Sequence, residues 1–202
     1  MKTVILIGAS GKMGKAARSG LEHHKVVTAS QTGEGCDYAV DITSRASLSE
    51  LYAKVGTFDA VVSAVGHCEY GPFEDLTEDQ WLTSANSKLL GQVNVVNAGL
   101  KFISDGGSFT LISGIHNIKP VPTSITDSTL SGAIDTFVRC VAYELPRGIR
   151  INSVNPTVLE ESWSVYGEML PGFEPVPGKR VGKAFQRSVD GFITGEVLFV
   201  DV

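Results

Sequence analysis

The sequence is poor in the residue types that build disulfide frameworks and metal centres. Its 202 residues include only three cysteines, Cys36, Cys68 and Cys140, which are far apart and form no Cys-x-x-Cys pair. An odd number of widely spaced cysteines does not predict a set of disulfides, and no histidine lies at zinc-ligand spacing from any of them. We therefore expect free thiols and no metal site.

The sequence also lacks long runs of one charge and long apolar runs. The net charge is −5 and no block of Lys or Arg is present, which argues against nucleic acid as a partner. The apolar run near the N-terminus ends at Gly8, too soon for a signal peptide or a membrane span. We expect a cytoplasmic protein without a membrane partner.

What is present is the composition of one compact domain. Apolar residues make up 43% of the chain and charged residues 19%, which is enough apolar surface to offset the entropy of ordering. We see no linker, repeat or low-complexity tract. The expectation is a single domain over residues 1–202.

Short apolar segments rich in Val and Ile alternate with segments of helical period. The apolar segments do not alternate with polar residues, which is typical of strands covered on both faces. This order predicts an α/β fold, a Rossmann-like, doubly wound sandwich of about seven mostly parallel strands with helices on both faces. The expected strands are 3–8, 25–30, 38–42, 58–66, 107–114, 149–154 and 195–202, and the expected helices are 12–22, 44–54, 77–101, 124–144 and 179–189.

Residues 155–178 form the one long irregular segment. They include four prolines and three glycines and follow an expected strand. Long loops in compact domains are often functional, so we expect a substrate lid within the domain.

A glycine-rich turn joins the first expected strand to the first expected helix. In "VILIGASGKMGKAA", Gly8 permits a tight turn, Gly11 lets the backbone approach a pyrophosphate, and Gly14 lets helix and strand pack closely. The helix N-terminus would direct its N–H groups toward the phosphates. This pattern predicts a dinucleotide site.

From the glycine turn onward, the chain resembles the short-chain dehydrogenase/reductase family over nearly its whole length. "VDI" ends the third strand, "SAVG" the fourth and "GSFTLISG" the fifth, and "ELPRGIRINSVNP" looks like the sixth. The glycine pattern differs slightly, because the family's middle glycine falls where this chain has Lys12. The resemblance implies an NAD(P)-binding Rossmann domain.

The resemblance also implies which residues contact the cofactor. An acidic residue after the second strand usually holds the ribose of NAD, but here Ser30 and Gln31 follow that strand and Lys12 is near in the turn. NADP(H) is therefore favoured over NAD(H). The expected cofactor-binding residues are Gly8, Ser10, Gly11, Lys12, Met13, Gly14, Ser30, Asp41, Ile42, Ala64, Gly66 and Pro156.

The expected active site is unusual. Ser113 matches the family's serine that hydrogen-bonds the substrate carbonyl, and Asn86 matches the helical asparagine that holds a water. The family's catalytic Tyr and Lys would fall on Asp127 and Ser131, in a segment rich in small and hydroxyl-bearing residues. Neither can replace the pair, since a serine cannot lower a neighbour's pKa and Asp127 should stay ionised beside the cofactor.

His116, three residues after Ser113, is the expected substitute proton donor. Tyr166 in the lid is a second candidate. The expected catalytic residues are thus Ser113, Asn86, His116 and Asp127. A Ser-His-acid hydrolase is disfavoured because the nucleophile-elbow sequence is absent.

Three functional hypotheses follow. The first is an NADP(H)-dependent oxidoreductase acting on a small carbonyl or alcohol of unknown identity. The second is a catalytically silent dinucleotide sensor or partner subunit that has lost the Tyr/Lys pair, and the third, a purely structural oligomer, conflicts with the glycine turn. By resemblance, the helices at 77–101 and 124–144 would pair in a homodimer or homotetramer.

Overall fold

A seven-stranded parallel sheet forms the centre of the computed structural model, which describes residues 1–201. The strand order is β3-β2-β1-β4-β5-β6-β7, and all six pairings are parallel. The predicted doubly wound α/β fold is confirmed. The strands are β1 (Thr3–Ile7), β2 (Lys25–Ser30), β3 (Tyr38–Ala39), β4 (Phe58–Ser63), β5 (Ile103–Ile112), β6 (Arg150–Pro156) and β7 (Val197–Val200).

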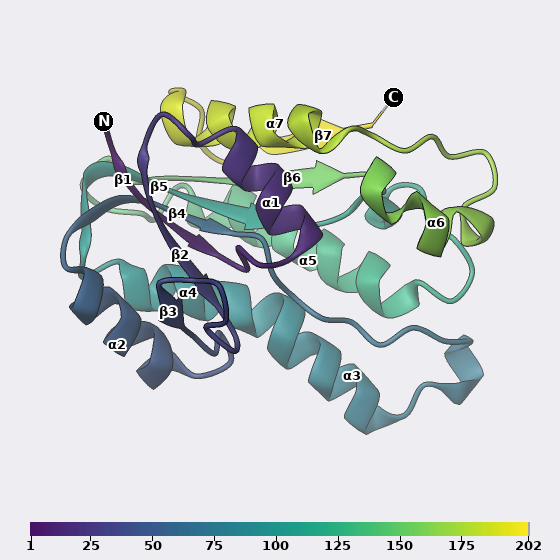
Figure 1. The fold of residues 1–202 in the computed structure, drawn as a ribbon. Coiled ribbons are helices and arrows are strands. Elements are labelled where there is room, and N and C mark those ends of the chain that lie inside the picture. Colours follow the sequence, from purple (N-terminus) through teal and green to yellow (C-terminus); the bar gives the residue numbers. More distant parts are fainter. Residues whose placement is uncertain (202) are drawn as a thin grey trace.

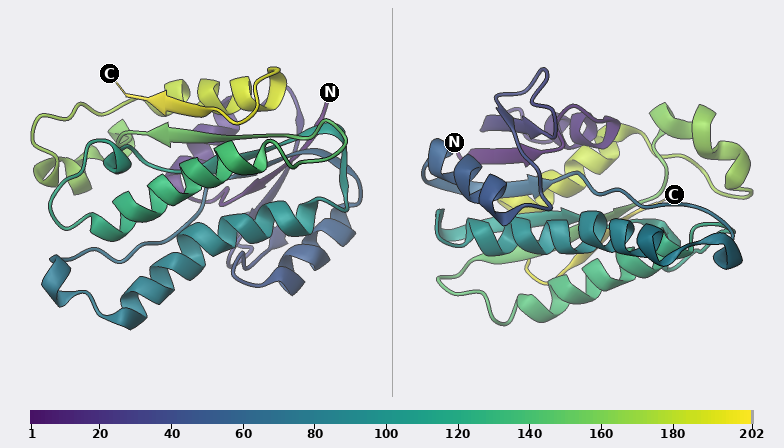
Figure 2. Two further views of the ribbon diagram at one scale, coloured as in Figure 1. Left: turned by 180° about the vertical axis from the view of Figure 1, so that it is seen from behind. Right: turned by 90° about the horizontal axis from the view of Figure 1, so that it is seen from below.

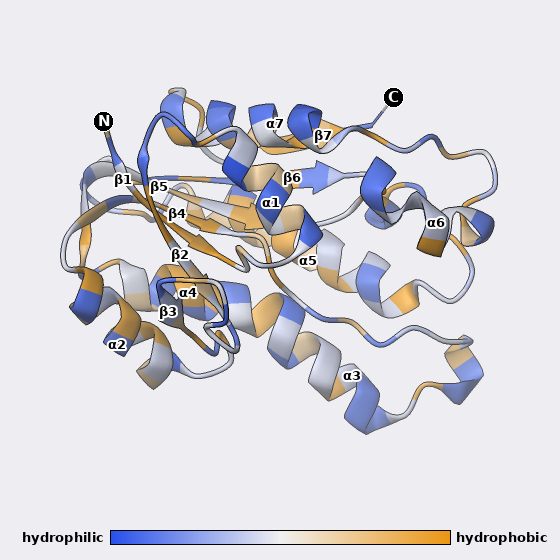
Figure 3. Ribbon diagram, viewed as in Figure 1, coloured by the Kyte–Doolittle hydropathy of each residue, from blue (hydrophilic) through white to orange (hydrophobic). Residues whose placement is uncertain are grey.

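Helices cover both faces of this sheet (Figures 1 and 2). The helices α1 (Lys12–Ser19) and α7 (Gly178–Asp190) pack on one face. The other face is covered by α2 (Arg45–Val55), α4 (Gly91–Gly99) and α5 (Ile125–Val141). Each face encloses its own apolar cluster, because strands that are apolar on both sides need cover on both sides. Figure 3 shows the apolar residues concentrated in the strands.

The long helix expected at 77–101 consists of three consecutive segments. These are α3 (Glu78–Ser84), the π-helical segment η2 (Ala85–Leu90) and α4. Thr77 and Gln80 form a capping box at its start, and Ser44 caps α2 by accepting a hydrogen bond from the Ser47 amide. Both helices therefore begin with a side-chain cap.

The segment predicted as a lid contains three short helical pieces. They are η4 (Glu160–Ser162), α6 (Trp163–Tyr166) and η5 (Gly167–Met169). In Figure 1, α6 lies beyond the carboxyl ends of the strands, on the side toward which β6 points. Two further short helices, η1 (Phe73–Asp75) and η3 (Ile115–Asn117), follow β4 and β5.

The described residues, 1–201, include no helix with the length and apolar character needed to cross a bilayer. The carboxyl ends of the parallel strands all meet at one edge of the sheet, where ligands of open α/β sheets bind. The candidate site is built at this edge.

Candidate functional site

The glycine turn after β1 is packed as the sequence predicts for Gly8 and Gly14. Gly8 has φ 87°, and a Cβ there would lie 2.8 Å from the Ala64 carbonyl oxygen. A Cβ at Gly14 would lie 2.1 Å from the Gly8 carbonyl oxygen, so α1 can approach β1 only without a side chain there. Gly11 is different, because a Cβ there would lie 3.5 Å from its nearest neighbour, the Gly8 carbonyl oxygen, which is an ordinary contact distance.

This difference gives a test of the turn. We expect Gly14→Ala to lower the free energy of unfolding by about 1–3 kcal/mol or more, because the methyl group overlaps the turn. Gly11→Ala should keep the fold but weaken dinucleotide binding, because the methyl group would project where a pyrophosphate approaches. Urea unfolding and NADPH titration of both variants check this. A Gly11→Ala protein that binds NADPH like wild type would contradict it.

Two hollows lie on either side of the glycine turn. The first, which we call the β1–β4 crevice, is lined by residues at the ends of β1 to β4, including Gly8, Asp41, Ile42 and Gly66. The second, the β5–β6 cavity, has a volume of about 400 Å³ and is lined in part by Met13, Ser113 and Pro156. Residues from the predicted cofactor set thus occur in both hollows.

Other predicted cofactor residues lie elsewhere. Ser30 is buried and its hydroxyl accepts a hydrogen bond from the Gly33 amide. The Lys12 ammonium donates to the Glu161 carbonyl oxygen at 2.7 Å, so Lys12 contacts the segment after β6 and not the end of β2. Ser10 is exposed and Ala64 packs against the apolar cluster beneath α1. Lys12 therefore does not support the preference for NADP(H), which was based in part on its expected position near the end of β2.

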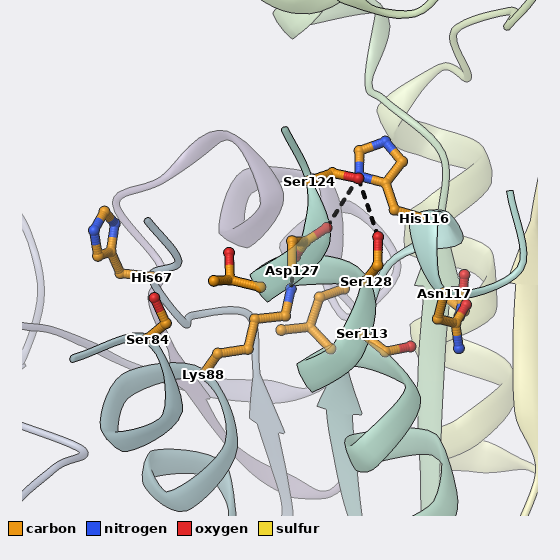
Figure 4. Close-up of polar contacts among 12 residues, drawn as sticks. His67, Ser84, Lys88, Ser113, His116, Asn117, Ser124, Asp127 and Ser128 are labelled. Carbon is orange, nitrogen blue, oxygen red and sulfur yellow. Dashed lines mark hydrogen bonds and ion pairs between the residues drawn. The ribbon is translucent and has the colours of Figure 1, made fainter. Parts of the chain in front are cut away.

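The β5–β6 cavity contains a charged group that the sequence did not reveal. Lys88 donates to Asp127 Oδ1 at 2.7 Å, and His116 Nδ1 lies 3.0 Å from Asp127 Oδ2 (Figure 4). The side chains of Lys88 and Asp127 are only 10% and 8% exposed. Three titratable side chains from η2, η3 and α5 therefore meet in one cavity beside Ser113.

Lys88 reaches the cavity through the geometry of η2. Within this segment the Gly91 amide donates to the Asn86 carbonyl, five residues back, as in a π-helix. Gly66, three residues after β4, has φ 152°, and a Cβ there would lie 3.2 Å from the Lys88 Cα. The glycine lets the lysine backbone approach the strand.

Gln92 joins this helix to β5, which ends at Ile112, one residue before Ser113. Its side-chain oxygen accepts from the Ile112 amide at 2.9 Å, and its side-chain nitrogen donates to the Ile112 carbonyl at 2.8 Å. The same nitrogen donates to the Lys88 carbonyl at 3.1 Å. One buried amide thus fixes the position of Lys88 relative to Ser113.

Asn86 lies away from this group. It is exposed and lines a different hollow, together with Arg45 and Asn94. A residue two positions from Lys88 on a helix points to a different side. The structure therefore does not bring Asn86 together with Ser113, His116 and Asp127. Lys88 lies in the cavity where Asn86 was expected.

Asp127 is held ionised. Burial by itself would raise the pKa of its carboxyl, but the hydrogen bond from His116 and the ammonium of Lys88 outweigh burial and hold the pKa at about 2. An ionised carboxylate can only accept hydrogen bonds, so His116 Nδ1 must carry the hydrogen in this contact. The expectation that Asp127 would be ionised thus has a structural basis in Lys88 and His116.

This pKa predicts a loss of stability in acid. Because the carboxyl pKa is lowered from 3.8, its contribution to stability is present above pH 3.8 and is lost as the pH falls through about 2. We expect Asp127 to account for about 2 kcal/mol of the decline in unfolding free energy over this window. Urea unfolding between pH 5 and pH 2 should show a smaller decline for Asp127→Asn than for wild type. Equal slopes would refute this assignment.

A second buried carboxylate positions His116. Asp135, on α5, accepts hydrogen bonds from Asn117 at 2.7 Å, Ser153 at 2.7 Å and Asn155 at 2.9 Å. Asn117 belongs to η3 and is adjacent to His116 in the chain. The network therefore fixes η3 between α5 and β6.

The hydroxyl-rich start of α5 anchors the loop that follows β4. Thr126 donates to the Glu69 carbonyl, and the Gly71 amide donates to the Thr123 carbonyl. These contacts place Tyr70 at the β5–β6 cavity, opposite Tyr166 from α6. The small and hydroxyl-bearing residues at this helix start thus hold one wall of the cavity.

Ser113 lines the cavity, but it is not part of a hydrolase triad. Its hydroxyl donates to the Val154 carbonyl at 3.5 Å, and no hydrogen bond joins it to His116 within residues 1–201. The hydrolase alternative therefore gains no support from the geometry.

Comparison with known proteins agrees with the fold. The family model described as enoyl-(acyl carrier protein) reductase matches residues 13–175. A solved structure, the protein lin1944 from Listeria innocua, is 41% identical with a TM-score of 0.95, and the match covers 99% of this chain and 100% of that one. A small-chain dehydrogenase solved in complex with NADPH is 21% identical, with a TM-score of 0.86 over 98% of this chain and 96% of that one.

Curated relatives are longer than this chain. A probable tetrahydroxynaphthalene reductase of Zymoseptoria tritici is 28% identical over 180 residues, which cover 76% of this chain and 67% of that protein. For other curated relatives the match spans about half of their length. The family model nevertheless matches most of the chain, and the solved structures share its fold throughout. The chain belongs to the short-chain dehydrogenase/reductase family.

Proposed function

We propose that this chain is an oxidoreductase that binds NADP(H) and interconverts a small carbonyl compound and its alcohol. The observation that carries the proposal is the buried group of Lys88, Asp127 and His116, which opens with Ser113 into one cavity beside the glycine turn. Titratable groups gathered in a cavity at this edge of the sheet are typical of active sites.

The residues present fit a dinucleotide. The turn at Gly8 and Gly14 leaves no room for side chains, and the N-terminus of α1 follows it directly. Asp41, Ile42 and Gly66 line the β1–β4 crevice, where the adenosine half would bind, and Met13 and Pro156 line the cavity on the other side. When bound, the reduced nicotinamide supplies a hydride to the carbonyl carbon.

The chain's own residues would supply the proton and the polar contacts. The Ser113 hydroxyl would donate a hydrogen bond to the carbonyl oxygen. His116, in its imidazolium form with a hydrogen on both ring nitrogens, would donate the Nε2 proton to the developing alkoxide, which becomes the alcohol. The ionised Asp127 would hold His116 through Nδ1, leaving Nε2 to serve the substrate. The Lys88 ammonium offsets the charge of Asp127 and favours negative charge on the substrate oxygen as it develops.

The preference for NADP(H) rests on the end of β2. The strand ends at Ser30 and is followed by Gln31 and Thr32, and none of the three would repel a 2′-phosphate. A structural relative at 21% identity was solved with NADPH.

Titration of the purified protein with NADPH and NADH by fluorescence tests the proposal first. We expect NADPH to bind more tightly. A carbonyl panel with wild type and Ser113→Ala then separates a reductase from a silent sensor. Failure of both dinucleotides to bind at millimolar concentration would refute the proposal, and so would NADPH binding without turnover of any carbonyl.

We also propose a homodimer or homotetramer. Exposed apolar side chains on the helical surface, Leu82 and Leu90, and on the edge strand, Phe199, support association. Light scattering of the purified protein would measure the number of copies.

A further inference from the structure

The lining of the β5–β6 cavity indicates what kind of substrate it accepts. Most of its wall is apolar and comes from the residues after β5 and β6 and from the helical pieces of 157–178. Two aromatic rings, Tyr70 and Tyr166, line it from opposite segments and are about half exposed. Half-exposed rings offer faces on which a flat apolar group can stack.

The cavity has no unpaired cation that could neutralise the full charge of an anionic substrate, although the paired Lys88 can still favour the smaller charge that develops on a carbonyl oxygen. Among the described lining residues, Lys88 is the only Lys or Arg, and its ammonium is already paired with Asp127 at 2.7 Å. His116 is held by the other oxygen of the same carboxylate. A substrate carboxylate or phosphate would therefore be buried without a partner, or would have to displace Asp127.

The two segments that contribute Tyr70 and Tyr166 to the cavity mouth are acidic, although none of their Asp or Glu side chains lines the cavity itself. Residues 66–87, which contribute Tyr70, contain five Asp or Glu and no Lys or Arg. Residues 157–178, which contribute Tyr166, contain four Glu and no Lys or Arg. All four of these glutamates are exposed, as are Glu74 and Asp75. Net negative charge on the segments that border a cavity lowers the local concentration of ligands of the same sign.

From the apolar walls, the paired ammonium and the acidic mouth, we infer that the substrate is an uncharged, largely apolar carbonyl compound with a ring or similar flat group. The inference rests on the proposed function for the location of the site, and it adds the substrate class. It separates this chain from an enzyme of carrier-protein or coenzyme A thioesters, because both carriers are strongly anionic and would approach across the acidic mouth.

A matched pair of ligands tests this inference without relying on turnover. Methyl 4-formylbenzoate and 4-formylbenzoate share their ring and aldehyde and differ only in the charge of the second group. Calorimetric titration of each into the protein without dinucleotide, so that no nicotinamide cation is present, gives the two dissociation constants. We expect the neutral ester to bind at least tenfold more tightly than the carboxylate.

A variant that adds a cation at the cavity mouth should change the ratio of the two dissociation constants. Glu168 is exposed and is adjacent to Met169, which lines the cavity. In Glu168→Lys the preference for the ester, expressed as the ratio of the two dissociation constants, should fall at least threefold. In Glu168→Gln the same ratio should fall by less. Both dissociation constants are measured in the same protein and only their ratio is compared. A change in the stability of a variant therefore does not affect the result.

The outcomes separate this inference from the proposed function. Equal or tighter binding of the carboxylate overturns the inference and leaves the oxidoreductase proposal intact, as does failure of both compounds to bind at about 10 mM. Tighter binding of the ester with no NADPH-dependent reduction of any carbonyl supports the inference on substrate class and counts against the proposed reaction.

Discussion

Replacing Lys88 by Met is expected to cost both stability and activity. The substitution keeps the length of the apolar stem but leaves the Asp127 carboxylate buried without its ammonium. Breaking a buried ion pair from one side typically costs about 3–5 kcal/mol. Loss of a cation that favours charge on the reacting oxygen should lower kcat by about 10²–10³. Urea unfolding and NADPH-dependent reduction of a carbonyl would measure the two effects.

The double variant Lys88→Met/Asp127→Asn separates the two effects. It removes both charges, so its unfolding free energy should lie closer to wild type than that of Lys88→Met alone, while its activity should stay low. Lys119→Met is the matched surface control, because Lys119 pairs with Asp201 at the same 2.7 Å but is 52% exposed. It should change stability by less than about 1 kcal/mol. A double variant no more stable than Lys88→Met would contradict the pairing.

Replacing His116 by Gln is expected to have the largest effect on turnover. Glutamine preserves a side-chain donor toward Asp127 but has no proton to give to an alkoxide. A positioned general acid contributes about 10²–10⁴ in rate, so kcat should fall by that factor. The dissociation constant for NADPH should change by less than about threefold, because the glycine turn and the β1–β4 crevice, which would hold the pyrophosphate and the adenosine, do not include His116.

His23→Gln provides the matched control for this experiment. His23 Nε2 also lies close to a carboxylate, 2.8 Å from Asp190, but at the opposite end of the molecule from the cavity. Its turnover should stay within twofold of wild type. Wild-type turnover in His116→Gln would remove His116 from the mechanism and would direct attention to Tyr166, the other candidate donor at the cavity.

The fold could be predicted from the sequence because its signals are local. The strands β1, β2 and β4 lie where runs of Val, Ile and Ala predicted them. The sheet is parallel, and a helix lies between every two consecutive strands except β2 and β3. Gly8 and Gly14 could be assigned to a tight strand–helix turn, since only glycine fits such close approach. These preferences act between residues near in sequence.

The candidate site could be predicted only in part. Ser113, His116 and Asp127 were identified and do line one cavity, but Asn86 was chosen where Lys88 faces inward. A signal for Lys88 was available: Ser84, Lys88, Gln92 and Val95 recur at helical spacing and are all buried. A lysine on the buried stripe of a helix needs a partner, and this would have drawn attention to it.

By itself, the sequence determined the order of strands and helices, the glycine turn and the edge of the sheet at which a site would form. Only the tertiary structure decided which charged groups meet there. Lys88, His116 and Asp127 come from three separate segments, and Asp135 and Gln92 fix two of those segments through bonds between residues far apart in the chain. The reason is physical: backbone preference and apolar periodicity are set by neighbouring residues, whereas the partner of a buried charge is set by how whole elements pack.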